Sequence, residues 1–234
     1  NMQAAVPLVG DVKVILRQLL DREFSAPDCG EWLERLQDYR RAELARVFPR
    51  REGYVFPGTL LRRPGARLAE DAAVCVDVGQ NQIFTCKYLP QKNGRLLTSG
   101  GLGTMGYALP AAVGVKVAQP GRQTVVVCGD GSFQMSMNEL AAVKCANLDL
   151  KILLFQNEVL GMVRQLQNAA PYHGPFGVAL DGSPDFQTIS AAYGIPCVQL
   201  RDEENIEGAL DEFLDSPGPC VLICHVHPDV GTND

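Results

Sequence analysis

Two residues in the middle of the chain, Asp130 and Asn157, have the chemistry and the spacing to bind one divalent cation together. Each follows an apolar run, residues 124–128 and 152–155, of the kind that forms strands buried on both faces of a parallel sheet. Neighbouring parallel strands end at the same edge of a sheet, where open α/β folds bind their ligands. A carboxylate and a carboxamide are hard oxygen donors suited to Mg²⁺ or Ca²⁺. The sequence therefore predicts a metal site at this edge.

The turn that contains Asp130 also predicts a phosphate site. Gly129, Asp130 and Gly131 turn the chain, and Ser132 is expected to cap the helix that follows. The backbone N–H groups of Gly131 and Ser132 then face a ligand at the start of that helix. A lone Gly-Asp-Gly is more often a plain turn. The strands on both sides and Asn157, 157 − 130 = 27 residues later, favour the ligand site.

Four segments resemble a known family. They are TSGGLGTMGYALPAAVG (98–114), GDGSFQM (129–135), LGMVRQ (160–165) and PDFQTISAAYG (184–194). Together they resemble the thiamine diphosphate-dependent enzymes, and they are most similar to the catalytic subunit of acetohydroxyacid synthase, also called acetolactate synthase. The resemblance covers roughly residues 72–225, with a fainter match at 6–20. It implies the C-terminal, diphosphate-binding domain of such an enzyme.

The resemblance and the strand pattern together predict the fold. We expect an α/β domain with a doubly wound, mainly parallel sheet and helices on both faces, spanning residues 68–234, and an N-terminal helical appendage. Residues 1–67 are expected to be a remnant of a central domain with linker helices. Within them, residues 6–20 predict a short strand, a turn and an amphipathic helix. Residues 50–67 are basic, rich in Pro and Gly and without periodicity, and so predict a linker.

The family pattern implies a set of cofactor-binding residues. The carbonyl of Gly103 is expected to accept from the 4′-amino group of the aminopyrimidine, and Met105 to hold the cofactor in its folded conformation. The carbonyl of Val159 would be the third protein ligand of the metal, beside Asp130 and Asn157. The full expected set is Gln80, Asn81, Gly103, Met105, Gly129, Asp130, Gly131, Ser132, Asn157, Val159, Leu160, Gly161 and Met162. Asn81 stands where the family usually has a His, and it could still donate a hydrogen bond.

The same pattern places Met162 and Gln165 toward the substrate. The implied reaction is decarboxylation of pyruvate and transfer of the two-carbon unit to a second 2-keto acid. Leu166 departs from the pattern, because acetohydroxyacid synthases usually carry a Trp there that favours 2-ketobutyrate as acceptor. Another thiamine enzyme, such as a 2-keto acid decarboxylase, an oxidase or a glyoxylate-type ligase, therefore stays open as an alternative.

A dinucleotide-binding domain is a further alternative. Gly101, Gly103 and Gly106 match G-x-G-x-x-G, and Asp130 follows 130 − 106 = 24 residues later, near the spacing that the Rossmann pattern wants. The strand signal before these glycines is short and weak. This alternative also leaves Asn157 unexplained.

Composition and motifs limit the partners. The net charge of −6 gives no basic footprint for nucleic acid, and no apolar run approaches the roughly 20 residues of a membrane span. Eight cysteines without a C-x-x-C favour a reducing cytoplasm. The resemblance implies Mg²⁺, possible FAD in the full-length protein, and a homodimer or homotetramer. In that assembly the pyrimidine-binding domain of a partner subunit supplies the activating Glu. The chain does not begin with Met, and we expect a piece of a longer protein that is inactive by itself.

Overall fold

The computed structural model describes residues 3–23, 25, 27–48, 50–90, 92–169 and 174–233. It divides the chain into two compact units, Asn1–Arg46 and Val47–Asp234. The first unit contains helices α1 (Val12–Leu20) and α2 (Gly30–Ala45), and none of the residues of these two helices is buried. The helix expected within residues 6–20 is present as α1, and it is capped by Asp11, whose carboxylate accepts from the backbone nitrogens of Lys13 and Val14. The strand expected before it is wrong, because residues 6–9 are irregular and the described part of this unit offers no strand to pair with.

The second unit is built on a six-stranded sheet in which every neighbouring pair of strands is parallel. The strand order is β2-β1-β3-β4-β6-β5. The strands are β1 (Ala73–Val76), β2 (Arg95–Leu97), β3 (Thr124–Gly129), β4 (Lys151–Gln156), β5 (Cys197–Leu200) and β6 (Cys220–His225). The predicted α/β class and parallel sheet are confirmed.

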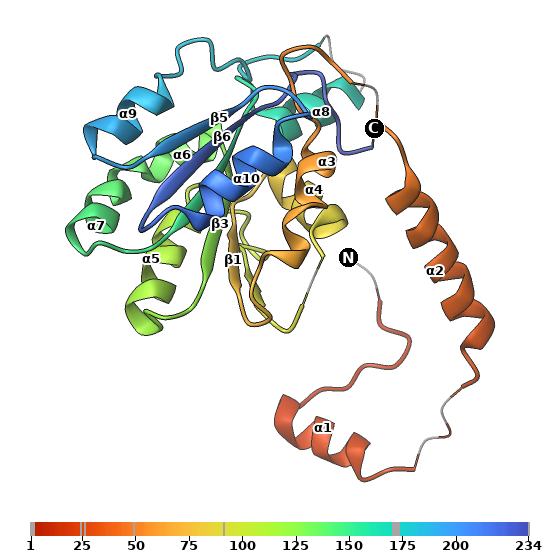
Figure 1. The fold of residues 1–234 in the computed structure, drawn as a ribbon. Coiled ribbons are helices and arrows are strands. Elements are labelled where there is room, and N and C mark those ends of the chain that lie inside the picture. Colours follow the sequence, from red (N-terminus) through yellow and green to blue (C-terminus); the bar gives the residue numbers. More distant parts are fainter. Residues whose placement is uncertain are drawn as a thin grey trace. The chain divides into compact units, whose positions relative to one another are not determined.

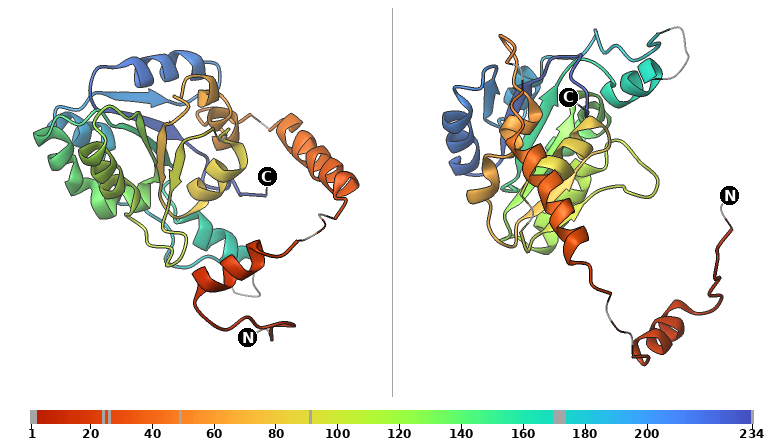
Figure 2. Two further views of the ribbon diagram at one scale, coloured as in Figure 1. Left: turned by 90° about the horizontal axis from the view of Figure 1, so that it is seen from below. Right: turned by 90° about the vertical axis from the view of Figure 1, so that its right-hand side faces the viewer.

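Helices cover both faces of this sheet (Figure 1), and the two layers can be followed in Figure 2 from two further directions. On one face lie α3 (Pro57–Leu61), α4 (Gln80–Tyr88) and α10 (Ile206–Asp215). On the other lie α5 (Ala108–Ala118), α6 (Asp130–Ser136), α7 (Leu140–Cys145) and α9 (Phe186–Ala192). The remaining elements are α8 (Gly161–Ala169) and the 3₁₀ turns η1 (Pro64–Ala66) and η2 (Met137–Glu139). No described helix combines the length and the apolar character needed to cross a membrane.

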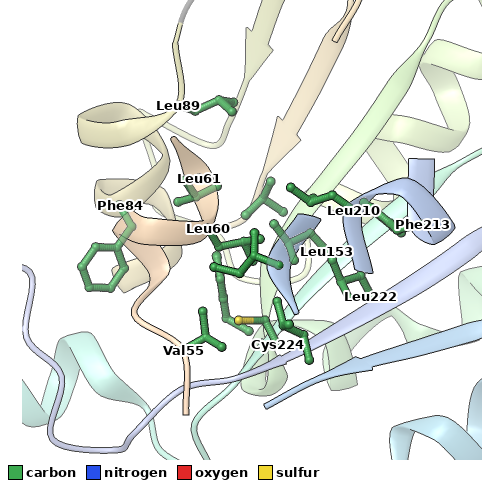
Figure 3. Close-up of a cluster of buried hydrophobic side chains, with 14 of the residues drawn as sticks. Val55, Leu60, Leu61, Phe84, Leu89, Leu153, Leu210, Phe213, Leu222 and Cys224 are labelled. Carbon is green, nitrogen blue, oxygen red and sulfur yellow. The ribbon is translucent and has the colours of Figure 1, made fainter. Parts of the chain in front are cut away.

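The side chains of each strand alternate between the two layers. Val125 and Val127 belong to the core under α3, α4 and α10, whereas Val126 and Cys128 belong to the core under α5, α6 and α7. Both cores are apolar, which is why β3 reads as a continuous apolar run. Figure 3 shows the first core, with Leu60 and other helix side chains directed at the strand residues.

The linker expected at residues 50–67 is wrong. This segment forms α3 and η1, and Val55, Leu60 and Leu61 are at most 1% exposed. They belong to the same apolar core as Phe84 of α4 and the strand residues Leu153 and Leu222 (Figure 3). By its contacts, the chain divides after Arg46. A helix of five residues that begins with Pro57 and Gly58 is too short to show a period, so the sequence pattern gave no sign of the burial.

The strand order reverses between β1 and β3. From β1 the chain moves to β2 on one side, and from β3 it moves to β4 on the other. The carboxyl ends of β1 and β3 therefore open a crevice at the switch point, where such sheets bind ligands. The same order contradicts the dinucleotide alternative. The glycine loop, residues 100–106, follows β2, and β1 separates β2 from β3, the strand directly before Asp130. In the Rossmann fold those two strands are neighbours.

Candidate active site

The carboxylate of Asp130 is joined to the loop that carries Asn157. Strands β3 and β4 pair in parallel, with Gly129 opposite Phe155, so both residues leave the sheet at its carboxyl edge. Asp130 Oδ2 accepts hydrogen bonds from the backbone nitrogens of Asn157, at 3.0 Å, and Glu158, at 2.6 Å. Asp130 Oδ1 accepts from the backbone nitrogen of Gly131 at 2.8 Å. The structure thus brings Asp130 to the segment of Asn157 at this edge, through backbone N–H groups and not through the carboxamide of Asn157.

The loop after Asn157 contains a residue with an unusual backbone conformation. Glu158 has a φ of +58°, a left-handed conformation that non-glycine residues rarely adopt. Val159 then forms an isolated antiparallel bridge with Ala179, in which the flanking residues Glu158 and Leu160 make the backbone hydrogen bonds. The peptide groups of Val159 therefore face the opposite way, and its N–H donates to Asn157 Oδ1 at 3.2 Å. Val159 lines the same cavity as Asn157.

That cavity has a volume of about 250 Å³ and lies at the switch point. All thirteen residues expected to bind the cofactor are among those that line it, and they come from the connections after β1, β2, β3 and β4. The apolar side chains of Phe84, Phe155, Val163 and Val226 complete much of the wall. A mostly apolar crevice with a few convergent polar groups is the usual form of a cofactor site.

Two glycines keep backbone close to this cavity. A Cβ on Gly161 would lie 2.0 Å from Gln80 Oε1, and a Cβ on Gly131 would lie 2.8 Å from Leu160 Cδ2. A Cβ at either position would force the end of a neighbouring side chain to shift, so glycine lets Leu160 and Gln80 lie this close to the backbone. Exposed peptide groups of this kind are suited to phosphate oxygens.

The burial of Asp130 favours a bound cation, because a cation would stabilise the charged form of a carboxyl that has little contact with water. Asp130 is only 2% exposed, and burial raises the pKa of its carboxyl above the ordinary value. The three backbone N–H groups oppose this increase, and the nearby charge of Glu158 adds to it. Within the described ranges no group of three or more His, Cys, Asp or Glu could hold a metal ion. A metal here would therefore need the neutral oxygens of Asn157 and Val159 beside one carboxylate.

Asn81 lines the cavity but directs its amide into the sheet. Its Nδ2 donates to the carbonyls of Asp77, at 2.7 Å, and Val127, at 3.4 Å. Both N–H bonds of the carboxamide are thereby engaged, so the hydrogen bond expected from Asn81 to a diphosphate is not available in this arrangement. The carboxamide of Gln80 is engaged in the same way, because its Nε2 donates to the carbonyl of Val230 at 2.9 Å and to Gln165 at 3.2 Å.

The three residues expected to face the substrate are placed differently from one another. Met162 lines the cavity. Gln165 lies on α8 outside that lining, and its Oε1 accepts from the backbone nitrogen of Thr232 at 3.0 Å. Leu166 is 62% exposed and also lies outside the lining. The structure thus brings one of the three to the site.

The sequence analysis missed one residue beside this site, Asp77. Its carboxylate is 1% exposed and accepts from the backbone nitrogens of Gly106 and Ala108. The available signal was a single acidic residue inside the apolar run of residues 73–78. A buried charge needs specific partners, so such a residue is informative in itself.

Comparison with known proteins identifies the family of this chain. Residues 77–224 match the family described as thiamine pyrophosphate enzyme, C-terminal TPP binding domain. The chain belongs to this family, and the resemblance found in its motifs is confirmed.

The similar proteins are acetolactate synthases. The chain is 36% identical to the acetolactate synthase large subunit of Pyropia yezoensis, over 97% of the chain and 39% of that protein. It is 35% identical to the isozyme 1 large subunit of Escherichia coli (strain K12), over 97% of the chain and 40% of that protein. For the Lactococcus lactis large subunit the identity is 35%, over 86% of the chain and 35% of that protein. The chain thus spans about two fifths of the length of these relatives.

Proposed function

We propose that this chain forms the Mg²⁺- and thiamine diphosphate-binding part of an acetolactate synthase large subunit. The observation that carries the proposal is the hydrogen-bonded meeting of Asp130 with the Asn157 loop on the wall of one cavity. The names of the similar proteins support the choice of enzyme. The residues present fit the cofactor, because the cavity combines hard oxygen donors with backbone that approaches closely at Gly131 and Gly161.

In this proposal three oxygens of the chain hold the metal. They are a carboxylate oxygen of Asp130, Oδ1 of Asn157 and the carbonyl oxygen of Val159. Mg²⁺ prefers six oxygen ligands and retains waters, so phosphate oxygens and water would complete its shell. Asp130 is fixed by three backbone N–H groups before the metal arrives. The carboxylate of Asp130 therefore needs little reordering to accept the ion.

The remaining lining residues divide by chemistry. Gln80, Gly129, Gly131 and Ser132 line the cavity and are assigned to the diphosphate, and Gln80 would exchange a present partner of its Nε2 for a phosphate oxygen. Gly103, Met105, Leu160, Gly161 and Met162 are assigned to the rings. When bound, thiamine diphosphate supplies a carbanion that serves as nucleophile and electron sink. The chain's own part is to bind, orient and partly enclose it.

The whole protein is proposed to decarboxylate pyruvate and to transfer the two-carbon unit to a second 2-keto acid. We further propose a homodimer or homotetramer in the cytoplasm, in which a partner subunit's pyrimidine-binding domain completes the site. FAD in the full-length protein remains part of the proposal. The chain alone is accordingly expected to be catalytically silent, and acetolactate formation by it would contradict this assignment.

A second candidate is another thiamine enzyme, and Leu166 favours it. Here Leu stands where acetohydroxyacid synthases usually carry Trp, and the side chain is largely exposed in this unit. Assays of the full-length protein with pyruvate alone and with added 2-ketobutyrate separate the two. Acetolactate supports the first candidate, whereas acetaldehyde without a ligation product supports a decarboxylase.

Calorimetry of the chain tests the cofactor assignment. Thiamine diphosphate at millimolar concentration should bind with Mg²⁺, and neither Asp130→Ala nor Asn157→Ala should show this binding. Asp185→Ala is the matched control, because Asp185 also accepts backbone hydrogen bonds, at the start of α9, but does not line the cavity. Binding of NAD in place of thiamine diphosphate, or unchanged binding in Asp130→Ala, would overturn the proposal.

A further inference from the structure

Asp77 connects two parts of the cavity wall that are far apart in the sequence. It lies directly after β1 and just before the turn with Gln80. Its Oδ1 accepts from the backbone nitrogen of Gly106 at 2.9 Å, and its Oδ2 accepts from that of Ala108 at 3.1 Å. Oδ1 also accepts from Val78 at 2.9 Å. The two carboxylate oxygens of Asp77 therefore hold the end of the glycine loop and the start of α5 in place.

The loop that Asp77 holds has few other supports. Residues 100–104 are exposed, and Leu102 is 94% exposed. At its other end the loop is closed by Ser99, which accepts from Gly103 and Thr104. Gly103 and Met105 nevertheless line the cavity. Their position relative to Asp130 therefore depends on the anchors at the two ends of an otherwise exposed loop.

The backbone of Asp77 is fixed as well. Its N–H donates to the carbonyl of Val127 at 2.8 Å, and its carbonyl accepts from Nδ2 of Asn81 at 2.7 Å. Val127 lies in β3, three residues before Asp130. Asp77 is thus hydrogen-bonded both to β3, the strand directly before Asp130, and to the loop that carries Gly103 and Met105. Burying an ionisable group is costly, and here the cost is offset by several backbone donors and by the start of a helix.

We propose that Asp77 is a positioning residue that sets the glycine loop against the diphosphate side of the cavity, and so governs recognition of the ring portion of the cofactor. The inference rests on the proposed function for the identity of the ligand. Its structural part, that Asp77 orders residues 103–108, stands independently of that ligand. Asp77 itself does not line the cavity, so it acts through Gly103 and Met105.

Two probes separate positioning from general support of the fold. In the 234-residue chain, thiamine diphosphate with Mg²⁺ reports on the whole site, and inorganic pyrophosphate with Mg²⁺ reports on the diphosphate side alone. Asp77→Asn retains the shape but places an N–H₂ group against backbone N–H donors. We expect about tenfold weaker binding of thiamine diphosphate, the equivalent of one charge-assisted hydrogen bond, and pyrophosphate binding within about twofold of the wild-type chain. Equal weakening of both ligands would overturn the positioning role.

Amide hydrogen exchange supplies a readout that needs no ligand. In the wild-type chain the amides of Gly106 and Ala108 should exchange slowly, in contrast to the amide of Gly101 in the same loop. Asp77→Asn should make both amides exchange faster without changing the protection of β4. Asp185→Asn, which alters a carboxylate that accepts from the start of α9, should leave both amides unchanged.

The outcomes distinguish this inference from the proposed function. If the wild-type chain binds no thiamine diphosphate, the proposed function fails, and the exchange rates still decide whether Asp77 orders the loop. If Gly106 and Ala108 exchange as fast as Gly101 in the wild-type chain, the inference is overturned, whatever the chain binds. This comparison holds even if Asp77→Asn does not fold.

Discussion

Gln80 and Gly161 approach each other so closely that Oε1 of the glutamine lies 2.0 Å from the place that a Cβ on the glycine would occupy. Gln80 is 8% exposed, and it donates to the carbonyl of Val230 and to Gln165. Any side chain at residue 161 must therefore displace a buried carboxamide that already has partners.

Gly161→Ala should destabilise the chain by about 1–3 kcal/mol, because Gln80 has to leave its hydrogen bonds. Urea unfolding followed by circular dichroism measures this change. Gly114→Ala is the matched control in α5, where a Cβ meets nothing within 4 Å. The control should gain about 0.5–1 kcal/mol from its helical position. Equal stability of the two variants would contradict the close packing described at residue 161.

The left-handed conformation of Glu158 predicts an order of stability among substitutions. Glycine adopts a φ of +58° without the steric cost of about 1 kcal/mol that other residues pay, and Asn tolerates this region better than most. We expect unfolding free energies in the order Gly and Asn above Glu, and Glu above Val. Thermal unfolding checks the order. Asn147→Val, at the other described non-glycine residue with a positive φ, should be destabilised in the same way.

His225 predicts a loss of stability in mild acid. Burial, assisted by the charge of Arg201, lowers the pKa of His225 from 6.5 to about 4. Between these values the unfolded chain binds a proton that the folded chain does not, so the unfolding free energy falls as the pH decreases from 6.5 to 4. His225→Gln should reduce this slope. A slope that is the same in both proteins would show that other groups cause it.

The boundary between the two units predicts the outcome of truncation. A chain that begins at Val47 should keep the unfolding midpoint of the full chain, because the described helices of the first unit bury no residue. A chain that begins at Leu68 loses Leu60 and Leu61, each worth about 2–5 kcal/mol in a core, and should fail to fold stably. Differential scanning calorimetry compares the three proteins. A stable chain from Leu68 would restore the domain boundary expected from the sequence.

The sequence pattern alone was sufficient to predict the positions of Asp130 and Asn157, which directly follow strands. The apolar run before Asp130 and the run before Asn157 each fix a strand, and parallel pairing then brings the two strand ends to one edge. The helix after Asp130 was placed less well. It begins at Asp130 instead of after Ser132, whose hydroxyl bonds to the backbone of Gly129.

Side-chain directions could not be obtained from the sequence in the same way. Asn81 faces the carbonyls of Asp77 and Val127 only because β1 and β3 are paired, and Gln165 bonds to Thr232, 67 residues later. Two partners of the Asp77 carboxylate, Gly106 and Ala108, lie 29 and 31 residues away, at the end of the glycine loop and at the start of α5, with no local sign of the contact. Such directions are decided by tertiary contacts, which spacing along the chain does not contain.

The bridge between Val159 and Ala179 has a consequence for how the enzyme could vary. Leu160 donates to the carbonyl of Val178, and Leu180 donates to that of Glu158. The loop at residues 157–160 is therefore held by residues 178–180, about twenty residues downstream. Under the proposed function, substitutions at residues 178–180 would change the affinity for the metal without altering any proposed ligand atom. Natural variation in this segment would then adjust the requirement for magnesium while the proposed ligands stay the same.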